Sequence, residues 1–261
     1  LTNHGKGKFR VCLVDYDLMF GDILSTLNFN PNQANMMDWI ADLDKKHKAG
    51  QEWNAISYDA GQIERFLQKK EESGLYSLIA PITNFDYMKI SNEEIVNLCG
   101  TMLRNIVENG DFDFVIVDTG NNIEDATYVS LERADEILLI LTQSMNSANC
   151  NNNFLNTMNH LEFDLSKIRI VINKAKPAKG VGISVNELQE ALKNPVTNQP
   201  FECYAKIKDN DAVQNVGEPM VYKSSHEFTK SIGEVAHHVI GDTFVLAKPK
   251  KKRFSFFRKN K

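Results

Sequence analysis

The sequence predicts an α/β protein with a doubly wound, mostly parallel sheet. Three observations indicate this fold: short apolar runs rich in β-branched residues recur along the chain, longer segments with helical spacing separate them, and several of the apolar runs have no polar face. Strands that are apolar on both faces are typical of parallel sheets covered by helices on both sides. With 261 residues, of which 42% are apolar, the chain can bury a full core.

Strands and helices alternate along the predicted chain. The strands are expected at Val11–Val14, Leu75–Ala80, Phe114–Val117, Ile137–Leu141, Ile168–Ile172 and Glu202–Ile207. Helices are expected at Glu93–Glu108, Asn146–Asn159, Ser184–Leu192 and Glu227–Ile240, with two or three more between Asn28 and Ser73. Alternation of this kind favours right-handed crossovers between parallel strands.

Polar residues follow three of these strands directly. They are Asp15 and Asp17 after the first strand, Asp118, Thr119 and Gly120 after the third, and Asn173 and Lys174 after the fifth. Ligands of doubly wound sheets bind at the carboxyl ends of the strands, and carboxylates there suit the magnesium ion of a phosphoryl-transfer site. A single aspartate in such a place more often caps the next helix. Because polar residues end three strands, we favour the metal site, with Asp118 as the firmest ligand; spacing alone does not rank Asp15 against Asp17.

Charge is distributed unevenly along the chain. Residues 248–261 contain eight basic residues and no acid, whereas residues 1–247 carry a net charge of about −12. A body this acidic does not favour a general nucleic-acid binder. The tail residues that we expect to contact an anionic membrane are Lys250, Lys251, Lys252, Arg253, Phe254, Phe256 and Phe257. A solvating tail and contact with DNA are the alternatives, and DNA is the less favoured partner.

The four cysteines (Cys12, Cys99, Cys150 and Cys203) lie far apart, without metal-binding spacing. This pattern favours small buried side chains in a reducing compartment over a disulfide or zinc framework. No apolar run approaches the length of a membrane span. We therefore expect a cytoplasmic protein that, if its tail contacts lipid, lies on the inner face of the plasma membrane.

Three long segments together carry a resemblance to a known family. They are VCLVDYDLMFGDILSTLNFNP (11–31), FDFVIVDTGNNIEDATYVSLERADEILLILTQ (112–143) and IVINKAKPAKGVGISVNELQEAL (170–192). They resemble the MinD/ParA group of deviant P-loop ATPases, and most closely the CpaE/TadZ branch, in which a similar VDLDLQFGD segment occurs. The resemblance extends from Arg10 to about Ile240. It implies one ATPase domain over residues 1–246, incomplete at its N-terminus, and a basic, phenylalanine-containing flexible tail over residues 247–261.

The resemblance implies an activity and a set of partners. Members of this group bind ATP and Mg²⁺, form a nucleotide-dependent homodimer and hydrolyse ATP slowly; the CpaE/TadZ branch positions a pilus or secretion assembly at the membrane. Residues 1–8 would be the tail of a helix that begins at the phosphate-binding loop. The loop and its central strand would then lie upstream of Leu1, and we expect a gap in the sheet of this chain, with unpaired backbone and apolar faces exposed. Loss of the phosphate site is the alternative, so ATPase activity depends on an upstream loop.

Residue roles follow from the same resemblance. Asp15 and Asp17 would position magnesium and the attacking water, and Asp118 would reach the metal through water. Thr119 and Gly120 would begin the second switch segment. Asn173 would hydrogen-bond the adenine with Lys174 beside it, and Ile207 and Asp209 would form the wall of the adenine pocket.

Two departures from the family pattern motivate other functions. Gly120-Asn121 and Lys208 stand where proline is usual in the family. A non-hydrolysing localisation adaptor with the same fold is therefore one alternative. A plasmid or chromosome partition ATPase that uses DNA as its matrix is the other.

Overall fold

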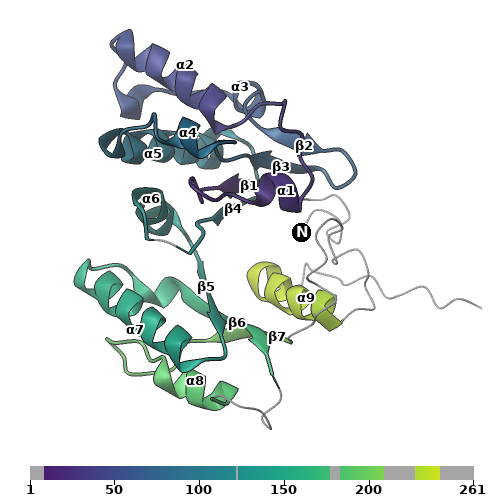
Figure 1. Cartoon of the computed structure of the whole chain (residues 1–261), viewed down its shortest axis with the longest axis vertical. Helices are drawn as coiled ribbons and strands as arrows, with labels where there is room; N and C mark the ends of the chain where they lie inside the picture. The colour runs from purple at the N-terminus through teal and green to yellow at the C-terminus, as the bar shows by residue number, and fades with distance from the viewer. Residues whose placement is uncertain (1–8, 122, 177–182, 209–226, 242–261) are drawn as a thin grey trace, which may run out of the picture.

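The computed structural model describes residues 9–121, 123–176, 183–208 and 227–241, and it confirms the predicted α/β fold class (Figure 1). The strands are β1 (Val11–Asp15), β2 (Gln68–Lys70), β3 (Leu75–Leu78), β4 (Phe114–Asp118), β5 (Ile137–Thr142), β6 (Ile168–Ala175) and β7 (Cys203–Lys208). The helices are α1 (Ile23–Thr26), α2 (Met36–Lys48), α3 (Ala60–Glu64), α4 (Asn84–Tyr87), α5 (Asn92–Asn109), α6 (Asp125–Arg133), α7 (Met145–His160), α8 (Val185–Ala191) and α9 (Glu227–Ile240), with short 3-10 turns at Trp53–Ala55 and Leu165–Lys167. All six predicted strands occur, with ends within three residues of those expected.

The strands form two hydrogen-bonded sheets. One sheet has the order β2-β3-β1-β4 and the other the order β5-β6-β7. Every pair is parallel except β2 with β3, which is antiparallel. Although β4 and β5 are consecutive in the chain and joined by α6, they do not pair with each other. Within the described residues, β4 and β5 each keep one edge without a paired strand (Figure 1).

Helices cover one side of both sheets continuously. The first core packs α2, α3 and α5 against β1, β3 and β4, and it includes Ala126 and Val129 of α6. The second core packs α7 and α8 against β5 and β6, and it includes Tyr128 and Leu131 of the same helix. Because α6 contributes to both cores, it joins the two halves of the molecule.

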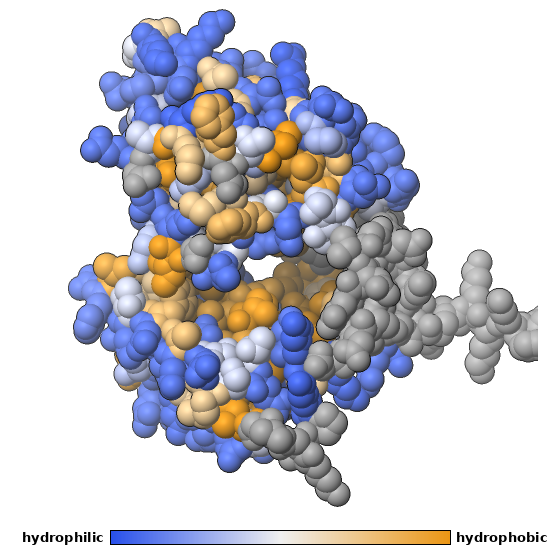
Figure 2. Space-filling model, in the orientation of Figure 1, coloured by the Kyte–Doolittle hydropathy of each residue, from blue (hydrophilic) through white to orange (hydrophobic). Residues whose placement is uncertain are grey.

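The opposite side of the sheets is covered only in part. Residues around α1 pack on Leu13 of β1, and α9 packs on Val171, Tyr204 and Ile207 of β6 and β7. Between these two helices, Ile116 of β4 remains 45% exposed and Ile140 of β5 55% exposed. The space-filling view shows an opening between the two halves with hydrophobic surface beside it (Figure 2).

The connection between β1 and β3 contains α2 and α3, as predicted, and the unpredicted strand β2. Trp39 of α2 anchors this region: its ring stacks on Phe66 at 5.0 Å and meets Tyr58 edge-on at 5.6 Å. The strand β2 has the polar sequence Gln-Lys-Lys, and the buried side chain of Gln68 donates to the backbone oxygens of Asn30 and Ala34. Backbone pairing and this side chain therefore hold a strand that has no apolar pattern.

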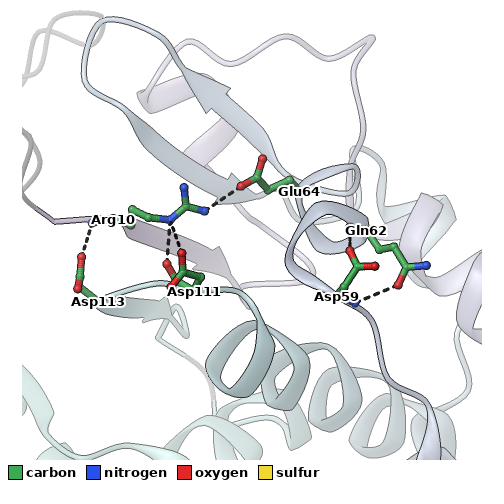
Figure 3. A network of polar contacts seen from close by, with 6 residues as sticks. All are labelled: Arg10, Asp59, Gln62, Glu64, Asp111 and Asp113. Atoms are coloured by element: carbon green, nitrogen blue, oxygen red, sulfur yellow. Dashed lines mark hydrogen bonds and ion pairs between the residues drawn. The ribbon is translucent and has the colours of Figure 1, made fainter.

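Arg10 fixes the start of β1 (Figure 3). Its backbone N–H donates to Asp113, and its guanidinium donates to the backbone oxygen of Asp111 and forms a 2.8 Å ion pair with Glu64 of α3. The guanidinium also lies over the ring of Tyr76, 5.1 Å from its centroid. These contacts tie the amino ends of β1 and β4 to the helical layer, at the end of the sheet opposite Asp15.

A buried asparagine on α5 holds the loop that precedes α3. Asn105 is fully buried, and its amide donates to the backbone oxygens of Ile56 and Thr101 and accepts from the backbone N–H of Tyr58. The Asn105→Ala substitution leaves these groups unsatisfied, so we expect the free energy of unfolding to fall by about 2–3 kcal/mol. Urea denaturation measures it. The matched control is Asn97→Ala on the exposed face of the same helix, for which we expect a change within about 0.5 kcal/mol.

The four cysteines divide evenly. Cys12 and Cys99 are buried as expected, whereas Cys203 is half-buried and Cys150 is exposed on α7.

Among the described residues, no helix is long and apolar enough to span a membrane.

Candidate functional site

Three carboxylates gather at the carboxyl ends of β1 and β4. Asp15 and Asp118 are register partners in the parallel pair, and the Tyr16 backbone N–H donates to the Asp118 backbone oxygen at 2.7 Å. Asp17 follows two residues after Asp15. A Cβ built on Gly120 would lie 2.4 Å from Asp17 Oδ2, so the loop after β4 rests against the Asp17 side chain. The structure therefore brings together the predicted residues of these two strand ends.

Asp15 is the most unusual of the three. It is 1% exposed, and neither carboxylate oxygen has a hydrogen-bond partner among the described residues. Burial, followed by the charge of Asp118, raises the pKa of this carboxyl to about 7; backbone N–H groups of Asp17 and Ile23 counteract this only partly, without forming hydrogen bonds of good geometry. A buried carboxylate without a partner costs free energy, and a cation bound beside it would remove that cost.

Two glycines keep the carboxylates close to the backbone. Gly120 has a φ of +63°, and its N–H donates to Asp118 Oδ1 at 3.2 Å. Gly21 lies so close to Asp15 and Ala80 that an added Cβ would be 2.7 Å from each side chain. Between the two, Asp17 Oδ1 accepts from the Phe20 N–H at 3.1 Å. Any side chain at Gly120 would therefore displace Asp17, in addition to the strain of its left-handed backbone.

Tyr16 orients the first loop, although the sequence did not single it out. It is buried on the side of β1 opposite Asp15, and its hydroxyl donates to the Cys99 backbone oxygen of α5 at 2.7 Å. Alternation along a strand places residues 15 and 16 on opposite faces. This alternation could have identified Tyr16 from the sequence, because an aromatic residue between two aspartates must point to the opposite face of the strand. There its ring is buried and its hydroxyl holds the strand end against α5.

The remaining predicted residues lie in the second sheet. Asn173 is the register partner of Thr142, and its side-chain oxygen accepts from the Lys174 N–H at 2.9 Å, with Lys174 at a φ of 51°. Both therefore lie at the carboxyl end of β6. The side chain of Ile207 is buried against α9, and Lys208 pairs with Glu227 of that helix. The structure thus places Asn173 and Lys174 near the carboxyl end of a strand of the second sheet, and it places Ile207 in the core.

Several predicted positions lie outside the described residues. These are residues 1–8, Asp209, and the tail positions Lys250, Lys251, Lys252, Arg253, Phe254, Phe256 and Phe257.

The donor set fits magnesium only with further ligands. No group of three histidine, cysteine, aspartate or glutamate side chains within the described ranges could hold a metal ion by itself. Magnesium, however, is commonly bound by one or two carboxylates together with water and the phosphates of a substrate. Asp118 is exposed, Asp17 is half-buried and Asp15 is buried beside them, and this set matches that mode of binding, since carboxylate oxygen is the ligand that magnesium prefers.

The strand order defines a doubly wound α/β protein, a class in which ligands bind at the carboxyl ends of the parallel strands, where Asp15 and Asp118 lie in this chain. No protein-family model matches the chain, and no curated protein matches its sequence. Solved structures identify the particular fold, which is that of the MinD/ParA ATPases.

Three solved structures illustrate this likeness. A ParA family ATPase from Chlorobium tepidum TLS has a TM-score of 0.68 and 20% identity over 89% of this chain and 86% of its own. The MinC:MinD cell division protein complex of Aquifex aeolicus has a TM-score of 0.67 and 18% identity over 95% of this chain and 90% of its own. The septum site-determining protein MinD of Pyrococcus horikoshii OT3, complexed with Mg-ADP, has a TM-score of 0.66 and 13% identity over the same shares.

Proposed function

We propose that this chain is a MinD/ParA-type ATPase of the CpaE/TadZ kind, which binds ATP and Mg²⁺, dimerises with nucleotide and positions a pilus or secretion assembly at the membrane. The observation that carries the proposal is the buried, unpartnered carboxylate of Asp15 beside Asp17 and Asp118, at the ligand-binding edge of this fold. The fold itself supports it, since one similar structure is a MinD complexed with Mg-ADP and another is a MinC:MinD complex.

In this proposal the carboxylates position the reacting groups. Asp17 and Asp118 would hold Mg²⁺, which neutralises charge on the phosphate oxygens during phosphoryl transfer. The buried carboxylate of Asp15 lies beside them and adds negative charge at the metal position. The hydrogen bond from Tyr16 to α5 fixes the end of β1 that carries Asp15 and Asp17. Thr119 and Gly120 form the switch that follows β4, and the contact of Gly120 with Asp17 links the two loops.

The second sheet would hold the base of the nucleotide. Asn173 and Lys174 end β6, where the side-chain amide can read an adenine edge and the lysine can approach phosphate. Asp209 would stand beside the base. Hydrolysis would also require a phosphate-binding loop, as in the family that the sequence resembles. Lys208, which stands where the family has proline, has a structural partner in Glu227.

Nucleotide-dependent dimerisation of the full-length protein tests this function. With Mg²⁺ and a non-hydrolysable ATP analogue, we expect the molar mass measured by light scattering to double, and the dimer to sediment with anionic vesicles through the basic tail. With ADP we expect a monomer. If the mass stays the same with both nucleotides, the nucleotide-switched ATPase is excluded.

Two further results separate the alternatives. A dimer that forms normally but releases no phosphate above background identifies the non-hydrolysing adaptor. Retention on DNA at low salt, without binding to anionic vesicles, identifies the partition ATPase. A variant that ends at residue 247 is the matched control, because it keeps the proposed nucleotide site and lacks the eight cations of residues 248–261.

A further inference from the structure

Three loops meet at the carboxyl ends of β1, β3 and β4. A Cβ built on Gly21 would lie 2.7 Å from the Ala80 side chain, so the loop after β1 contacts the loop after β3. The loop after β4 rests against Asp17 of the first loop. It also lies near α4, because burial and then the charge of Glu124 raise the pKa of Tyr87. The three loops therefore form one continuous surface around the carboxylates.

This surface exposes large apolar side chains. Phe20 of the first loop is 63% exposed, and Phe85 and Met88, which follow β3, are 70% and 77% exposed. Ile123, in the loop after β4, is exposed as well. Three of the four most exposed large apolar side chains in the described part of the chain thus lie on this surface. Apolar side chains that gather at the surface mark an interaction site.

The same surface is strongly acidic. Seven acids and one base lie in its three segments, which are residues 15–22, 80–89 and 118–125. The base is Lys89, and it already forms a 2.8 Å ion pair with Asp86. The buried carboxylate of Asp15, whose oxygens have no partner among the described residues, lies in the middle of these segments. An anionic lipid surface would be repelled here, so the surface fits an occupant that is both basic and apolar.

The tail of this chain has the complementary chemistry. Residues 248–261 contain eight basic residues and no acid, and Phe254, Phe256 and Phe257 lie among them. Its cations can pair with the acids of the loops while its aromatic rings cover the exposed apolar side chains. Charge and apolar surface therefore match at the same time, in a segment that belongs to the same polypeptide.

The tail is long enough to reach this surface. Lys208 at the end of β7 pairs with Glu227 in the first turn of α9. His238 near the end of α9 stacks on Tyr204 near the start of β7, so α9 runs antiparallel to β7 and ends on the side of the sheet opposite the carboxylates. The surface is then on the order of 30 Å away, about 20 Å along the strands and about 25 Å across them. Thirteen residues lie between the end of α9 and the first phenylalanine of the tail, and they span at most about 45 Å.

We propose that residues 248–261 dock on the surface formed by the loops after β1, β3 and β4, with their cations against its acids and their phenylalanines against Phe20, Phe85 and Met88. The inference deepens the proposed function, on which it rests only for the release of the tail. Mg²⁺ with ATP occupies the same edge of the sheet and pairs with its carboxylates, so it competes with the tail and frees it for an anionic membrane. Docking itself rests on charge and apolar exposure and needs no nucleotide.

Limited digestion of the full-length protein with trypsin tests the docking. Cleavage after Arg253 and Arg258, the sites that flank the phenylalanines, is followed by mass spectrometry without nucleotide. The Phe85→Ser/Met88→Ser protein should be cleaved there at least about tenfold faster than the wild type, because its tail is released. The matched control is Val96→Ser/Val107→Ser, at exposed positions of α5, which should be cleaved at the wild-type rate. Equal rates in all three proteins overturn the proposal.

A photo-cross-linker locates the docked tail. p-Benzoylphenylalanine replaces Phe256 in the full-length protein, and mass spectrometry maps the cross-links that form without nucleotide. We expect cross-links within one chain to residues 18–22, 82–88 and 123–125, with a yield at least about tenfold lower in the Phe85→Ser/Met88→Ser background. Cross-links only between two chains overturn the proposal, because the occupant is then a second copy. Cross-links only to other surfaces overturn it as well.

The two proposals fail separately. If the full-length protein dimerises with nucleotide but its tail is cleaved equally fast in every variant, the docking is wrong and the ATPase assignment stands. If Phe85→Ser/Met88→Ser speeds cleavage but Mg²⁺ with a non-hydrolysable ATP analogue changes neither the cleavage rate nor the molar mass, the docking stands and the ATPase assignment is wrong.

Discussion

The Asp118→Ala variant of the full-length protein is expected to hydrolyse ATP at least about 100-fold more slowly than the wild type. Asp118 ends β4, is the register partner of Asp15, and holds the Gly120 N–H through its Oδ1. The substitution removes one charge from the proposed magnesium site and releases the turn that rests on Asp17. Both losses affect the transition state, in which charge on the phosphate oxygens must be neutralised.

Phosphate release under saturating ATP measures this effect, and nucleotide binding is measured beside it. The matched control is Asp135→Ala, because Asp135 is an exposed aspartate just before the amino end of β5, far along the strand direction from the site. We expect the control to keep the wild-type rate. An Asp118→Ala protein that hydrolyses ATP as fast as the wild type would remove Asp118 from the mechanism and the ATPase assignment with it.

The strands could be predicted because most of them carry their own signal. The run Ile168–Ala175 is largely buried, and Ile137–Thr142 is almost entirely apolar although Leu138 and Ile140 remain exposed, so composition alone marks both strands. The strand β2 carries no such signal, since its Gln-Lys-Lys sequence is polar and its conformation depends on pairing with β3. Tertiary pairing, which local sequence does not encode, decides such a strand.

The residues of the candidate site could be predicted from the sequence, but their burial and their contacts with other loops could not. Aspartates at two strand ends indicate a ligand-binding edge from local sequence alone. The burial of Asp15 could not be predicted in the same way, because it depends on Gly21 and Ala80 approaching from other segments. The contact between Gly120 and Asp17 likewise joins loops that are about 100 residues apart in the chain. The packing of Ile207, for which a nucleotide contact was predicted, could not be predicted from local sequence either, because its side chain packs against the distant helix α9.

The Asp15→Asn variant is expected to be more stable than the wild type above pH 7 when no divalent cation is present. In the folded chain the pKa of Asp15 is raised from 3.8 to about 7, chiefly by burial. The folded state thus binds the proton more tightly than the unfolded state, and the wild type is destabilised as pH rises from about 4 to about 7. Three pKa units correspond to at most about 4 kcal/mol, at about 1.4 kcal/mol for each unit. Asparagine is neutral at every pH, so it removes this dependence.

Urea denaturation at pH 4 to 8 in EDTA measures the difference. We expect the two proteins to differ by less than about 1 kcal/mol at pH 4, where Asp15 is protonated in the folded state and about half protonated in the unfolded state, and the variant to gain up to about 4 kcal/mol at pH 8. The matched control is the Asp135→Asn substitution, which removes an exposed carboxylate away from the site. Mg²⁺ with nucleotide should reverse the order in the full-length protein by stabilising the wild type more than Asp15→Asn. A flat difference for Asp15→Asn would show that this carboxylate is solvated or already paired. A rising difference that magnesium cancels would show that the fold keeps an unfavourable buried charge for the cation it binds.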